Sequence, residues 1–132
     1  MRNSLNPGAR FLFWGALNAG LAVMLGAFGK HALKSMLSEP MMETWRTAAY
    51  YHLTHALALV LVAVIVERSS RPDRVAVAGW LLLTGMLLFS GSLYLLALTG
   101  FRPLGIVTPL GGGCFLFGWF WLARSAMPNT AS

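Results

Sequence analysis

Apolar residues gather along the chain into four long runs that carry no charged side chain. The runs are 19, 20, 27 and 21 residues long, and their bounds are 11–29, 47–66, 75–101 and 103–123. A helix needs roughly 20 apolar residues to cross the hydrocarbon core of a bilayer. The pattern predicts one integral membrane domain over residues 1–132. We expect an all-α bundle with up-down topology and transmembrane helices at about 11–31, 45–66, 75–100 and 105–123.

Composition supports a membrane protein and excludes a soluble domain. The chain is 57% hydrophobic and 11% charged, with a mean hydropathy of +0.65. A soluble domain carries about a quarter charged residues because its surface must face water. The lipid bilayer is therefore the first partner that the sequence predicts.

Positive charge has a distribution that argues against nucleic acid as a partner. The net charge is +6, but the arginines lie at the ends of the apolar runs, where lipid headgroups attract cations. No basic stripe with interleaved aromatic residues is available for nucleic-acid binding.

The same charges predict the orientation of the chain. Four spans place both termini on one side of the membrane. That side holds six cationic residues: Arg2, Arg10, Arg68, Arg71, Arg74 and Arg124. The other side holds four: Lys30, Lys34, Arg46 and Arg102. Lysine and arginine are in excess in cytoplasmic loops, so the counts favour cytoplasmic termini.

Small residues recur where helices would pack. Lipid gives no hydrophobic drive for helix association, so small side chains that permit close approach are enriched at helix interfaces. In the first run small residues recur at steps of three and four, at positions 15, 19, 22, 26 and 29. We assign helix packing to eight residues: Gly15, Ala22, Gly26, Gly29, Gly85, Gly91, Gly111 and Gly112.

The third run shows a seven-residue repeat. Leucines at 81, 88 and 95 alternate with Gly85, Ser92 and Thr99. Large and small side chains that alternate at this period are typical of the seam of a left-handed bundle. We interpret the repeat as a packing pattern and not as a cofactor site.

The start of the fourth span is ambiguous. Thr108 and Pro109 have the types preferred at the N-cap and first position of a helix. A helix from Pro109 to Ala123 has only 15 residues, or roughly 22 Å. Residues 103–108 must then either continue as a kinked helix or enter the membrane as irregular chain buried in protein.

Polar side chains within the runs are the candidates for function, because such groups are costly in hydrocarbon. His55 lies near the middle of the second run, and Tyr51 is one turn earlier on the same face, whereas His52 is offset by roughly 60°. The candidate polar cluster comprises His31, Tyr51, His55, Ser90, Ser92, Tyr94 and Thr108.

Three interpretations of the histidines stay open. They could be neutral imidazoles bonded across the bundle to Asn18, Ser90, Ser92 or Tyr94. They could bind a metal or haem, but no carboxylate within the runs completes a ligand set, so we predict no metal site and no cofactor. They could move a proton or a small solute. Catalysis lacks a base and an orienting acid at a known spacing from any serine or threonine, so no enzyme is predicted.

Several short motifs follow one another along the chain: GAFGKHAL at 26–33, WRTA at 45–48, Tyr51, HALAL at 55–59, FSGSLY at 89–94 and TPLGG at 108–112. In this order they resemble the DUF423 family of small bacterial membrane proteins, which are related to eukaryotic transmembrane protein 256. The resemblance covers about residues 10–124. It implies a four-helix protein of the bacterial inner (plasma) membrane, of uncharacterised function. It also draws attention to nine positions: Gly29, His31, Tyr51, His55, Ser90, Gly91, Tyr94, Pro109 and Gly111.

Two positions depart from the pattern of that family. Lys30 stands where the pattern usually has a small residue, and His52 stands where it often has glutamine.

We expect a non-enzymatic accessory or structural subunit that packs within the bilayer, as a homo-oligomer or in a larger membrane complex. The alternative is a component of a small oligomeric transporter or channel that uses the polar cluster.

Overall fold

A computed structural model describes residues 6–128 and shows helices joined by short turns. The elements are α1 (Pro7–Phe28), η1 (Gly29–Leu33), α2 (Glu39–Arg68), α3 (Pro72–Gly85), η2 (Met86–Ser90), α4 (Gly91–Thr99) and α5 (Leu104–Ala126). The segments η1 and η2 are single turns of π-helix. The described residues form no strand, so the predicted all-α class is confirmed.

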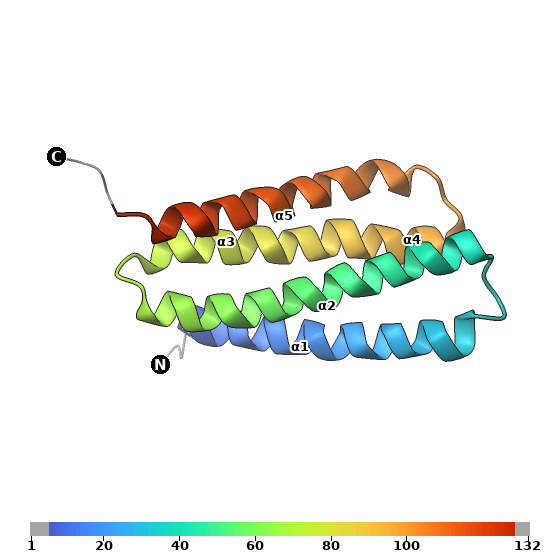
Figure 1. Cartoon of the computed structure of the whole chain (residues 1–132), viewed down its shortest axis with the longest axis horizontal. Coiled ribbons are helices and arrows are strands. Elements are labelled where there is room, and N and C mark those ends of the chain that lie inside the picture. The colour runs from blue at the N-terminus through green and yellow to red at the C-terminus, as the bar shows by residue number, and fades with distance from the viewer. Residues whose placement is uncertain (1–5, 129–132) are drawn as a thin grey trace, which may run out of the picture.

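These elements form four membrane-spanning helices in up-down order (Figure 1). Their bounds are Pro7–Leu33, Glu39–Arg68, Pro72–Thr99 and Leu104–Ala126. Each span extends beyond the predicted apolar run at one end or both. The second span has 30 residues, or about 45 Å, which exceeds the roughly 30 Å hydrocarbon core. Its polar ends therefore lie at the headgroups.

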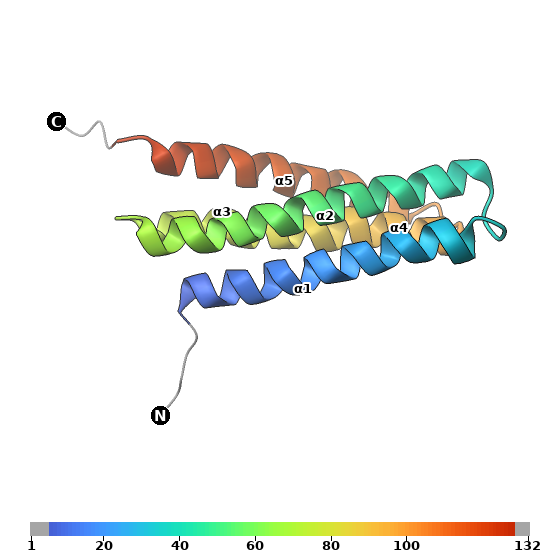
Figure 2. The same ribbon diagram turned by 60° about the horizontal axis from the view of Figure 1, so that its bottom comes forward.

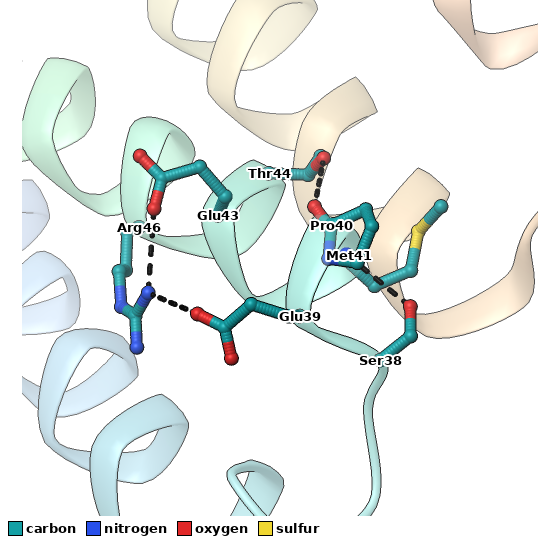
Figure 3. A network of polar contacts seen from close by, with 7 residues as sticks. All are labelled: Ser38, Glu39, Pro40, Met41, Glu43, Thr44 and Arg46. Carbon is teal, nitrogen blue, oxygen red and sulfur yellow. Dashed lines mark hydrogen bonds and ion pairs between the residues drawn. The ribbon is translucent and has the colours of Figure 1, made fainter.

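The span α2 begins with a side-chain cap, as Figure 3 shows. The Met41 backbone N–H donates to Ser38 Oγ at 3.4 Å, and Pro40 occupies the first turn. Proline lacks an N–H, and the first helical N–H groups have no partner within the helix, so proline costs little there.

Beside this cap, Arg46 forms ion pairs with two carboxylates of its own helix (Figure 3). Its Nη1 lies 3.1 Å from Glu39 Oε1 and 3.3 Å from Glu43 Oε2. All three side chains are exposed, so solvent screens the pairs and they add little to stability. They balance the charge of Arg46 locally.

The helix α2 is central to the packing. It contacts α1, α3, η2 and α4, whereas α5 packs on α3, η2 and α4. Figure 2 shows α1 and α5 on opposite sides of the central helices. The main core is built from fully buried side chains that include Phe11, Leu59, Val62 and Leu82.

Close helix contacts are made at some of the small residues assigned to packing. A Cβ on Gly15 would lie 2.8 Å from Val60 Cγ2 and 3.0 Å from the Ala56 carbonyl oxygen. Ala22 is buried. Side chains at Gly29, Gly85 and Gly111 would collide with Trp45, Phe115 and the Phe89 backbone, respectively. These positions bring α1 onto α2 and α5 onto α3 and η2.

Three of the eight residues assigned to packing make no close contact with another helix. Gly112 is in ordinary contact, with a built Cβ 3.8 Å from the Phe89 ring. Nothing lies within 4 Å of a Cβ at Gly26 or Gly91. Residues seven apart are nearly in line on a helix, whereas a step of four turns by roughly 40°. Gly26 is therefore rotated from the contact face that Ala22 shares with Gly15 and Gly29.

The predicted N-cap role of Thr108 is wrong. The helix α5 begins at Leu104, four residues earlier, and contains Pro109 in its interior. Backbone hydrogen bonds between residues 101–103 and 104–106 form the first turn of this helix, and one of them joins the Gly105 N–H to the Arg102 carbonyl at 2.9 Å. Irregular backbone is costly in hydrocarbon, so the chain stays helical although Pro109 removes one hydrogen bond. Residues 104–108 are thus helical, while Pro103 lies at the helix cap.

The seven-residue seam holds as far as Ser92, two residues beyond η2, and no further. Gly85 and Ser92 are buried, but Leu95 is 52% exposed and Thr99 is exposed. Within η2 the Gly91 N–H donates to the Met86 carbonyl, five residues back. A π-turn holds more residues than an α-turn, so the buried face shifts and the repeat no longer follows it.

Candidate functional site

A chain of hydrogen bonds centred on His52 crosses three helices. His52 is 7% exposed. Its Nε2 lies 2.9 Å from Asn18 Oδ1 of α1, and its Nδ1 lies 3.1 Å from the Tyr94 hydroxyl of α4. The ring therefore links α1 and α4 through α2.

The direction of each bond in this chain follows from the Asn18 amide. Its Nδ2 donates to the Trp14 carbonyl at 2.8 Å, so Oδ1 is the atom that faces His52. An amide oxygen can only accept, so His52 carries its proton on Nε2. His52 Nδ1 is then the acceptor for the Tyr94 O–H. We assign a neutral Nε2–H tautomer with both nitrogens bonded.

The Tyr94 ring is held from a second side by Trp45. The two rings meet edge to face with centroids 4.7 Å apart. Trp45 Nε1–H donates to the Leu25 carbonyl at 2.8 Å, and its indole lies against Gly29. The Trp45 indole packs directly against the backbone where α1 continues into η1, and this close contact requires a residue without a side chain at position 29.

His55 makes a separate set of contacts toward α5. It is 5% exposed. Its Nδ1 lies 2.8 Å from the Tyr51 carbonyl, one turn back on α2. Trp119 Nε1–H donates to His55 Nε2 at 3.1 Å. A carbonyl only accepts and an indole N–H only donates, so His55 is a neutral Nδ1–H tautomer.

Aromatic rings cover the face of the His55 imidazole. Phe115 stacks on it with centroids 3.6 Å apart and an interplanar angle of 13°. Phe115 also meets Phe89 at 5.5 Å, and Tyr51 packs on Phe89 at 4.8 Å. His55 is thus enclosed by rings as well as bonded at both nitrogens.

A third polar group joins α4 to α5. Ser92 Oγ lies 2.7 Å from Thr108 Oγ1. Ser92 Oγ also donates to the Phe89 carbonyl at 2.9 Å, and Thr108 Oγ1 lies 3.4 Å from the Leu104 carbonyl. Interhelical hydroxyl pairs of this kind join helices within a membrane.

Ser90 differs from the other members of the predicted cluster. It is 1% exposed, and within residues 6–128 its Oγ has no hydrogen-bond partner. It ends the π-helical segment η2. Buried hydroxyls are nearly always bonded to protein or to ordered water.

The structure distributes the predicted cluster over separate groups. Tyr94 belongs to the His52 chain, His55 and Tyr51 to the aromatic group, and Ser92 and Thr108 to the hydroxyl pair. His31 is exposed in η1, and its side chain makes none of the side-chain hydrogen bonds found among the described residues. Tyr51 is 38% exposed, and only its backbone carbonyl takes part in the hydrogen bonding.

Three bonded residues were absent from the predicted cluster: Asn18, His52 and Trp119. Asn18 and His52 each carried a usable signal, since a polar group in an apolar run needs a partner. The tryptophan carried none, because its place near the end of a span is typical of an interfacial anchor.

Metal ligation has no support in the described part of the chain. No three histidine, cysteine, aspartate or glutamate residues within 6–128 are grouped so that they could hold an ion. The nitrogens of His52 and His55 already have partners.

Four apolar helices with buried, internally bonded polar groups define a polytopic helical membrane protein. Residues 25–112 match the family described as "Protein of unknown function (DUF423)". This chain belongs to that family, as the motifs in its sequence predicted.

Relatives of the same size support this membership. The chain is 44% identical over 117 residues to the UPF0382 membrane protein YwdK of Bacillus subtilis. The aligned residues cover 89% of this chain and 95% of YwdK. It is 47% identical to a UPF0382 membrane protein of Staphylococcus epidermidis, with 89% and 94% covered. A relative in Staphylococcus aureus is 45% identical over 85% of this chain and 90% of its own length. No solved structure matches the chain.

Proposed function

We propose that this chain is a non-enzymatic structural or accessory subunit of the bacterial inner membrane, with cytoplasmic termini. The observation that carries the proposal is the bonding of the two buried histidines. Each ring has a partner at both nitrogens, within 3.1 Å. Both partners of each ring belong to the chain itself.

A histidine that moves protons or binds a ligand needs a nitrogen that can exchange its partner. Here Nε2 of His55 accepts from Trp119, and Nδ1 of His52 accepts from Tyr94. Adding a proton to His55 would set its Nε2–H against the Trp119 N–H, and adding one to His52 would require the Tyr94 hydroxyl to turn and accept. The bonds instead serve to hold α2 in register with α1, α4 and α5, which is a structural role.

Partners of such a subunit would bind within the bilayer. The connections between the helices, at 34–38, 69–71 and 100–103, leave little surface outside the membrane. The lipid-facing sides carry large exposed apolar residues, among them Ile106 and Leu116, each 74% exposed. A homo-oligomer or a larger membrane complex would cover part of these faces.

A second function, as a component of a small oligomeric transporter or channel, is favoured by one observation. The buried Ser90 Oγ has no partner within the described chain. A free buried hydroxyl is where a water or a small solute would bind in such a path.

The two functions are separated by flux through proteoliposomes. We expect vesicles with the wild-type chain to conduct protons no faster than empty vesicles under an imposed pH gradient. A flux that is lost in Ser90→Ala, while Ser125→Ala keeps it, would overturn the structural proposal and support the transporter. Ser125 is a matched control because its hydroxyl already bonds the Leu122 carbonyl at 2.6 Å.

The accessory role itself is tested by native mass spectrometry of the protein extracted with its own lipids. We expect a second chain, identical or different, in a fixed ratio to this one. A monomer at every protein concentration would contradict the proposal.

A further inference from the structure

An apolar groove opens between α2 and α5 near the end of the bundle where the α2–α3 turn lies. Its volume is about 470 Å³, within the range of about 300–1,000 Å³ usual for ligand pockets. The walls are formed by α2 and α5, and Val75 of α3 lies between them. The groove exists because α5 packs on α3, η2 and α4 and makes no backbone contact with α2 in the described chain.

The lining of this groove changes in character along its length. Leu61, Val64 and Ile65 line it from α2, and Leu122 faces them from α5. Its end at the membrane surface is polar and includes Arg68 and Ser69. Leu61 and Arg68 are seven residues apart, so the apolar part extends roughly 10 Å deeper than the charge.

The charge at the polar end is positive and is not balanced within the groove. Arg68 is exposed, its guanidinium has no ion-pair or hydrogen-bond partner within residues 6–128, and no carboxylate lines the groove. The nearest acid in sequence, Glu67, lies instead against Gly8 of α1. Ser69 Oγ accepts from the Arg71 backbone N–H at 3.0 Å, which leaves its own proton to donate.

We propose that this groove binds an anionic phospholipid. One acyl chain lies along the Leu61, Val64 and Leu122 side chains, and the phosphate is bound by the Arg68 guanidinium and the Ser69 hydroxyl. The order of apolar walls followed by a cation matches the order of chain and headgroup in a lipid. The inference goes beyond the proposed function, since it concerns neither the histidines nor a protein partner.

The experiment is native mass spectrometry of delipidated full-length protein in detergent, titrated with dioleoylphosphatidylglycerol or dioleoylphosphatidylcholine. We expect the anionic lipid to be retained more strongly. Arg68→Gln should lower the affinity for phosphatidylglycerol about fivefold, the usual contribution of one basic residue near an anionic lipid surface. It should leave phosphatidylcholine binding unchanged. Arg10→Gln is the matched control, because it removes an exposed arginine outside the groove at the same end, and it should change neither affinity.

A second pair of variants tests the groove itself. Val64→Trp should fill it and weaken both lipids, whereas Leu57→Trp, two turns deeper and outside the lining, should not. Equal phosphatidylglycerol binding in wild type and Arg68→Gln would overturn the proposal. So would displacement of the lipid by glycerol phosphate at equal concentration, which would indicate a free-anion site. A lipid-independent dimer that Val64→Trp dissociates would show that a second copy occupies the groove, and would also overturn it.

Discussion

His52 and His55 lie three residues apart on α2 and contact different neighbours. A step of three residues turns the helix by roughly 300°, so the two side chains are offset by about 60°. His52 bonds Asn18 and Tyr94, whereas His55 bonds Trp119 and the Tyr51 carbonyl. Because their partners differ in kind, one ring carries its proton on Nε2 and the other on Nδ1. Each histidine bonds at least one other helix: His52 bonds α1 and α4, and His55 bonds α5.

Gly29 and Gly26 give a prediction at the scale of one residue. Gly29→Ala should destabilise the fold by about 1–3 kcal/mol, since the new methyl displaces Trp45 from its bond to the Leu25 carbonyl. Gly26→Ala should be neutral or stabilise by up to about 1 kcal/mol, because nothing lies within 4 Å of its Cβ and alanine favours the helix. The free energy of unfolding in mixed micelles, followed by tryptophan fluorescence, checks both. Equal values for the two variants would contradict this account of Trp45.

At this scale the sequence predicted the kind of interaction better than the residues that make it. Imidazoles bonded across the bundle to Asn18 or Tyr94 were among the open interpretations, and His52 forms those bonds. His55 was a candidate because it lies near the middle of the second span. Its actual partner, Trp119, is 64 residues away, and sequence spacing holds no information on which faces of distant helices meet.

The helix α5 owes its position to the contact between Gly111 and η2. A Cβ at Gly111 would collide with backbone atoms of Phe89, and backbone cannot rotate away as a side chain can. Next to this contact, Phe115 packs on Gly85 and stacks on His55. The close approach of α5 thus brings the aromatic group together.

Gly111→Ala should therefore loosen the whole of α5. We expect a loss of about 1–3 kcal/mol or more and a weaker bond from Trp119 to His55. Gly113→Ala is the control, since its Cβ has nothing within 4 Å and should leave stability unchanged or slightly raised. Thermal unfolding in detergent measures the difference, and a Gly111→Ala midpoint that matches the control would rule the contact out as a determinant of packing.

Element positions were predictable from the apolar runs, but two local features were not. The π-helical segment η2 ends the seven-residue repeat of the third span, and Pro109 lies inside α5. Propensity alone favours a helix that starts at Pro109. The cost of unpaired backbone in hydrocarbon outweighs that preference, which a local sequence pattern does not express.

The whole molecule is a bundle whose ends differ in charge. The end with the α2–α3 turn holds Arg10, Arg68, Arg71, Arg74 and Arg124, and Arg2 lies outside the described residues. The opposite end holds Lys30, Lys34, Arg46 and Arg102. The first end thus has five described cationic residues and the second has four, and this excess of positive charge supports our proposal that the first end faces the cytoplasm.

Cysteine labelling checks that orientation in a Cys114→Ala background. Ser35→Cys lies in the α1–α2 connection and Ser70→Cys in the α2–α3 turn, and both positions are exposed. In intact spheroplasts, an impermeant maleimide should label position 35 and leave position 70 unlabelled until the membrane is opened. The reverse pattern would contradict the orientation.

The claim that the buried histidines are structural is tested most directly by nitrogen-15 NMR of histidine-labelled protein in lipid bilayers. His31→Asn leaves two imidazoles in the chain. At pH 7 we predict two neutral rings of opposite tautomer, Nε2–H for His52 and Nδ1–H for His55, assigned with His52→Gln. The same tautomer at both sites, or a protonated ring at either, would contradict the closed bonding on which this account depends.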